Sequence, residues 1–171
     1  MKIFVTVGFE TFPFDRLLQA IHKGLQRRLI RGEVSIQIGH SRCEVPAHES
    51  YRFLGFDELV VRIKEADIVI SHAGVGTTLL CLTLGKTPIL FPRQSRFHEH
   101  VDDHQIQFAR KMESQGKALV AYDEDDLFDK ISHYASFVKR TFRSLAEEKS
   151  DSLRSTLEEI LAHCAGRKEA S

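Results

Sequence analysis

Residues 66–78 read Ala-Asp-Ile-Val-Ile-Ser-His-Ala-Gly-Val-Gly-Thr-Thr. The apolar run from Ile68 to Ile70 is typical of a strand that is buried on both faces, as in a parallel sheet. Two glycines and two threonines follow it, and a helix is expected from about Thr77 to Leu84. Strand, turn and helix are the repeating unit of an α/β fold, in which ligands bind where strands end.

The same alternation of short apolar runs and longer amphipathic segments continues on both sides. It predicts a doubly wound, Rossmann-like parallel sheet in a single domain of residues 1–171, with 137–165 as a C-terminal helical segment. The expected strands cover residues 3–7, 34–39, 67–71, 87–92 and 118–121, with a short strand or turn at 52–56. The expected helices cover residues 17–29 (ended by Gly32), 58–65 (capped by Asp57), 77–84, 101–114 and a segment opened by Asp123–Asp126.

Composition excludes several classes of protein. The chain has 171 residues, with 24 Lys and Arg against 24 Asp and Glu, and this balance argues against a non-specific nucleic-acid binder. The cysteines Cys43, Cys81 and Cys164 lie too far apart for a zinc ribbon or a disulfide framework. This cysteine pattern fits a reducing cytoplasm, where the chain is expected. No apolar run reaches the ~20 residues that span a bilayer.

Two of three chemically interesting segments are glycine turns after strands. In the first, Gly8 permits a tight turn and the hydroxyl of Thr11 could meet a phosphate. In the second, Gly74 and Gly76 let the backbone approach an anion at a helix N-terminus, where Thr77 and Thr78 follow. Both are also compatible with ordinary β–α turns, and His72 with a packing role.

The third segment, residues 92–105, is dense in polar side chains. His98, His100, Asp102, Asp103 and His104 suggest a metal site, but the order Asp102-Asp103-His104 differs by one place from the H-x-H-x-D-H run of metallo-β-lactamase-type hydrolases. No metal is therefore expected, and a metallohydrolase that uses the His98–His104 loop stays an alternative.

Taken together, these segments resemble the C-terminal domain of family 28 glycosyltransferases. The likeness rests on residues 66–77, Leu84–Pro88, Pro92 and Asp103–Gln105 in that order, and the opening at residues 4–8 fits as well. It covers about residues 2–120. It is strongest for small stand-alone members: the catalytic subunit of the two-part enzyme that adds the second GlcNAc to dolichol-diphosphate-GlcNAc, and the small subunits of bacterial capsule and exopolysaccharide glycosyltransferases.

The resemblance implies the donor-binding half of a GT-B glycosyltransferase. In this half a UDP-sugar is substrate, and no cofactor is needed. The implied donor-binding residues are those of the three segments: Gly8, Thr11, His72, Gly74, Gly76, Thr77, Thr78, Arg93, Asp103, His104 and Gln105. Related enzymes often hold the ribose with a Glu where this chain has Leu80.

The expected function is therefore that of a donor-binding catalytic subunit in a two-part inverting glycosyltransferase. It would move a sugar to a lipid-diphosphate-linked acceptor in polysaccharide or glycolipid synthesis, with Arg93, Arg96 or His98 assisting the leaving diphosphate. A membrane-anchored partner would supply the acceptor site and hold this chain at the inner face of the membrane. The general base stays unassigned, with His100 as a candidate, and a non-catalytic nucleotide-sugar-binding subunit is the alternative.

Overall fold

The computed structural model describes residues 1–140, and residues 141–171 lie outside the described part. Residues 1–137 form one compact unit. Of the helical segment expected at 137–165, the described residues up to 140 are helical. No helix within the described part is both long enough and apolar enough to cross a membrane.

Within residues 1–140, six parallel strands form one sheet in the order β3-β2-β1-β4-β5-β6. The strands are β1 (Lys2–Thr6), β2 (Glu33–Gln37), β3 (Glu49–Tyr51), β4 (Ile68–Ser71), β5 (Ile89–Leu90) and β6 (Leu119–Val120). The direction of winding reverses between β1 and β4. Since Thr6 pairs with Ser71, these two strands end side by side at the point where such sheets bind ligands.

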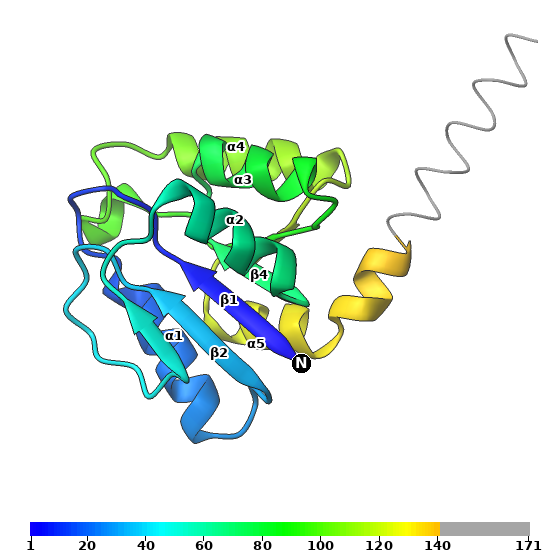
Figure 1. Cartoon of the computed structure of the whole chain (residues 1–171). Coiled ribbons are helices and arrows are strands. Elements are labelled where there is room, and N and C mark those ends of the chain that lie inside the picture. The colour runs from blue at the N-terminus through cyan, green and yellow to red at the C-terminus, as the bar shows by residue number, and fades with distance from the viewer. Residues whose placement is uncertain (141–171) are drawn as a thin grey trace, which may run out of the picture. The chain divides into compact units, whose positions relative to one another are not determined.

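Helices cover both faces of the sheet (Figure 1). They are α1 (Asp15–Gln26), α2 (Phe56–Glu65), α3 (Val75–Thr83), α4 (His104–Ser114) and α5 (Glu124–Ser132). Val5 and Ile70 point into a core that α1 and α5 close, whereas Phe4 and Val69 point to the opposite face, under α2 and α3. Alternate side chains of β1 and β4 thus pack against helices on opposite faces of the sheet. The predicted doubly wound α/β fold is confirmed.

Four predicted boundaries were wrong. The short strand lies at Glu49–Tyr51 and not at 52–56, since Ser35 pairs with Glu49. Gly55, not Asp57, is the N-cap of α2, and its N–H donates to the Glu58 carboxylate at 3.2 Å.

The helix expected from Val101 begins at His104, because the Asp102 carboxylate accepts the His104 N–H at 3.1 Å and residues 101–103 are not helical. At the other end of the chain, α1 stops at Gln26, well before Gly32. The expected start of α5 is confirmed: Asp123 caps it by accepting the N–H of Asp126 at 2.9 Å.

Candidate functional site

The turn that opens α3 presents unpaired backbone donors. Gly74 is the N-cap, and its own N–H donates to the His72 carbonyl at 2.8 Å. The N–H groups of Val75, Gly76 and Thr77 meet no acceptor among residues 1–140. With the positive end of the helix dipole behind them, these three donors form an anion-binding turn beside the end of β1.

The two threonines of this turn have different surroundings. The Thr78 side chain is buried, and its hydroxyl donates to the Gly74 carbonyl at 2.8 Å. Thr77 is half-buried and follows Gly76 in the same turn. A Cβ on Gly76 would meet no heavy atom within 4 Å, so this part of the turn is open. Thr77 is therefore the threonine that an anion at this turn would meet first.

His72 fills the space between two of the predicted glycines. A Cβ on Gly8 would lie 2.3 Å from Cε1 of His72, and a Cβ on Gly74 would lie 2.2 Å from its Nε2. Gly8 also has a φ of +77°, which L side chains rarely adopt. The two glycines therefore bring the loop after β1 and the turn after β4 together around one imidazole.

Burial keeps this imidazole neutral. The His72 side chain is almost fully enclosed, and burial lowers its pKa to about 3, with a further contribution from the positive charge of Arg93. A neutral, enclosed ring shapes the turn and carries no charge to an anion. Of the two roles expected from the sequence, phosphate donor or loop support, the geometry favours loop support.

Arg93 is fully buried and ties the two neighbouring loops together. Its Nη1 donates to the carbonyls of Phe12 at 2.8 Å and Glu99 at 3.1 Å, and its Nη2 donates to the Val7 carbonyl at 2.9 Å. The guanidinium lies over the Phe14 ring at 4.5 Å, and burial lowers the pKa of Arg93 to about 10. Arg93, expected to assist the diphosphate, is thus engaged with the backbone on which the site is built.

A partly buried ion pair between Arg16 and Glu99 extends this support, and sequence reasoning missed it. Arg16 binds both carboxylate oxygens of Glu99 at 2.9 Å and donates to the carbonyls of Pro92 at 2.7 Å and Tyr122 at 3.0 Å. Glu99 also accepts the N–H of Gln94 at 3.0 Å. Arg16 and Glu99 are 83 positions apart, and no local pattern marks either of them.

The segment expected to face the donor sugar is anchored at its start. Asp103 accepts the N–H of Ser95 at 2.8 Å, and this bond lowers the pKa of the Asp103 carboxyl group. Gln105 is buried, and its Oε1 accepts the N–H of Arg93 at 3.2 Å. His104 is exposed beside Asp102.

The remaining candidates lie around this edge of the sheet. Thr11 is exposed in the loop after β1 and makes no hydrogen bond to the α3 turn within residues 1–140. His100 is close to Asp102 and His104, whereas His98 is exposed and lies outside that group. Leu80 packs with the apolar residues under α2 and α3.

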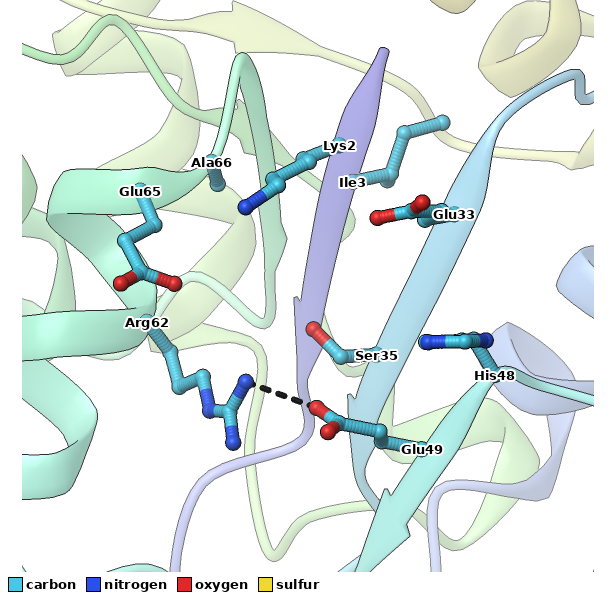
Figure 2. A pocket seen from close by; sticks show the side chains of 9 residues that line it. All are labelled: Lys2, Ile3, Glu33, Ser35, His48, Glu49, Arg62, Glu65 and Ala66. Carbon is cyan, nitrogen blue, oxygen red and sulfur yellow. Dashed lines mark ion pairs between the residues drawn. The ribbon is translucent and has the colours of Figure 1, made fainter.

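A separate pocket of about 170 Å³ lies near the opposite, amino ends of β1 to β3 (Figure 2). It carries charges of both signs, and its Arg62 pairs with Glu49 at 2.7 Å. Because the anion-binding turn is at the carboxyl ends of the strands, this pocket is not part of the candidate site.

The strand order, the switch point and the helix-terminal turn define a Rossmann-like α/β domain. The chain belongs to the glycosyltransferase family 28 C-terminal domain, whose model matches residues 2–162. UDP-N-acetylglucosamine transferase subunit ALG13 of Yarrowia lipolytica is 28% identical over an alignment of 140 residues, covering 74% of this chain and 68% of that one.

Two solved glycosyltransferases show the same fold. MurG of Acinetobacter baumannii superposes with a TM-score of 0.54 at 17% identity, over 80% of this chain and 43% of its own. The spinosyn rhamnosyltransferase SpnG, complexed with thymidine diphosphate, gives a TM-score of 0.57 at 17% identity over 92% of this chain and 45% of its own. The chain therefore spans less than half the length of these enzymes.

Replacing Gly74 with Ala should lower the free energy of unfolding by about 2 kcal/mol or more, because the new methyl group collides with the His72 ring. In a His72→Ala background the same change should cost under about 1 kcal/mol, since the ring is gone. Gly76→Ala, which meets open space, is the matched control. Denaturant unfolding of the four variants measures the coupling, and additive costs would contradict the contact between Gly74 and His72.

The low pKa of His72 should make stability depend on pH. The folded pKa of about 3 lies below the unfolded value of 6.5, so the unfolded state takes up the proton first. This contribution is complete above pH 6.5 and is lost as pH falls toward 3. Between pH 6 and 4 the wild type should lose about 1.4 kcal/mol per pH unit more than His72→Asn does. Equal slopes in denaturant titrations would show that His72 titrates normally.

Proposed function

We propose that this chain is the donor-binding catalytic subunit of a two-part inverting glycosyltransferase. The anion-binding turn at Val75–Thr77 carries the proposal, because every UDP-sugar presents a negatively charged diphosphate. The printed names of its relatives support it: one is a subunit of a UDP-N-acetylglucosamine transferase, and another was solved with thymidine diphosphate.

Transfer requires the leaving diphosphate to be stabilised as negative charge develops on it. The N–H groups of Val75, Gly76 and Thr77 are fixed by α3 before the donor arrives, so they gain strength in the transition state without reorganisation. Asp103 and Gln105 follow at the start of α4, where their side chains are expected to meet sugar hydroxyls. No metal is needed for this charge stabilisation in the proposed mechanism.

The acceptor hydroxyl also needs a general base, which we assign to the partner subunit. The acceptor would be a lipid-diphosphate-linked saccharide, presented at the inner face of the membrane by a membrane-anchored partner in polysaccharide or glycolipid synthesis. The printed name of the Yarrowia lipolytica relative, a transferase subunit, supports such a division.

The diphosphate turn can be tested without disturbing its packing. A side chain at position 76 meets no atom within 4 Å, and a carboxylate there favours the helix start. Gly76→Asp should therefore fold normally but weaken UDP binding at least ~10-fold by charge repulsion. Gly76→Asn, with nearly the same shape and no charge, should stay within ~3-fold of the wild type. Calorimetric titration with UDP measures both, and equal affinities for Asp and Asn would reject the turn as the diphosphate site.

The two-part assignment predicts that UDP-sugar is turned over only with the partner. The chain alone should bind UDP without transferring sugar, whereas the co-purified pair should glycosylate a lipid-diphosphate acceptor, in EDTA as well as without it. Full transfer by this chain alone would exclude the two-part arrangement. UDP binding without transfer by the pair would favour a non-catalytic nucleotide-sugar-binding subunit.

A further inference from the structure

Three side chains with metal-ligating atoms meet at the N-terminal end of α4. Nδ1 of His100 lies 3.4 Å from Oδ1 of Asp102, and Nδ1 of His104 contacts that same oxygen. The ligand atoms of all three residues lie within 4.8 Å of one another. We propose that His100, Asp102 and His104 bind a divalent transition-metal cation of the Zn²⁺ type.

The backbone of residues 101–104 builds this arrangement. Asp102 precedes the first residue of α4 by two positions, and its carboxylate accepts the His104 N–H at 3.1 Å. The N–H of Asp102 in turn approaches Nδ1 of His100 at 3.4 Å, so that nitrogen is the acceptor and carries the lone pair. A bound cation would replace this long contact, because a histidine ligand gives the lone pair of a neutral ring nitrogen to the metal.

A carboxylate lies near the far side of His100. Nε2 of His100 lies 3.8 Å from Glu10, and its ring packs 6.1 Å from that of Phe12. Ligating histidines commonly direct their second nitrogen to a carboxylate, which fixes the tautomer and raises ligand basicity. Since Glu10 lies in the loop after β1, the cation would join that loop to the start of α4.

Ligand type and exposure select the class of cation. Two imidazoles and one carboxylate suit Zn²⁺ and its neighbours in the first transition row, whereas Mg²⁺ prefers oxygen ligands. The side chain of His100 is 12% exposed, but those of Asp102 and His104 are 58% and 52% exposed, so water can complete the coordination. The site has no part in the transfer mechanism above and does not depend on it.

The test is a calorimetric titration of the full chain with Zn²⁺ and, separately, with Mg²⁺. The wild type should bind Zn²⁺ at this site and show no comparable Mg²⁺ binding. His104→Ala and Asp102→Asn should each weaken Zn²⁺ binding at least ~10-fold, and Glu10→Gln should weaken it less. His98→Asn is the matched control, because His98 is in the same loop, lies outside the group and has a left-handed backbone that Asn tolerates.

A second readout follows stability. Zn²⁺ at ~100 times its dissociation constant should raise the melting temperature of the wild type by roughly 5–10 °C, and should raise that of His104→Ala much less. Zn²⁺ affinity unchanged in both His104→Ala and Asp102→Asn would overturn the proposal, as would Mg²⁺ binding as tightly as Zn²⁺. Gly76→Asp should keep Zn²⁺ binding while losing UDP, so the two proposals fail independently.

Discussion

One buried guanidinium, that of Arg93, joins the loop after β5 to the loop after β1. Arg93 lies where β5 ends, yet it donates to carbonyls of the loop after β1 as well as to that of Glu99. A buried charge that loses its partners costs several kcal/mol, so these loops are bound to one arrangement. Val7, whose carbonyl accepts from Arg93, directly precedes Gly8, which lies against the His72 ring. Arg16, paired with Glu99, fixes the other end of the same connection.

The charged side chains of Arg93 and Glu99 lie beneath the surface that would meet a ligand. Arg93 is enclosed and donates to backbone carbonyls, Glu99 is enclosed and pairs with Arg16, and His72 is neutral. The donors left open at the carboxyl edge are backbone N–H groups of α3. Ionic groups thus determine the shape of the edge, while peptide dipoles determine what the turn can bind. Such preorganised dipoles stabilise an anion without moving toward it.

The order of strands and helices could be predicted because buried strands and amphipathic helices leave local periodic patterns. β3 was misplaced because it is short and polar, and only its pairing with β2 defines it. The glycines of the site were predicted from the space that an anion needs, but His72 also occupies space that Gly8 and Gly74 leave. Arg93 was expected at the diphosphate, but its burial and that of Glu99 could not be predicted, since both depend on loops that meet only in the folded chain.

The peptide donors at the start of α3 have one further consequence. A phosphate site built from lysines or histidines gains and loses affinity as those groups ionise, whereas an amide N–H keeps its partial charge throughout the physiological range. The affinity of this turn for an anion therefore depends on its geometry and on ionic strength, and not on the pH. The acid limit of ligand binding would then come from the ligand's own phosphates or from protonation of the scaffold around His72.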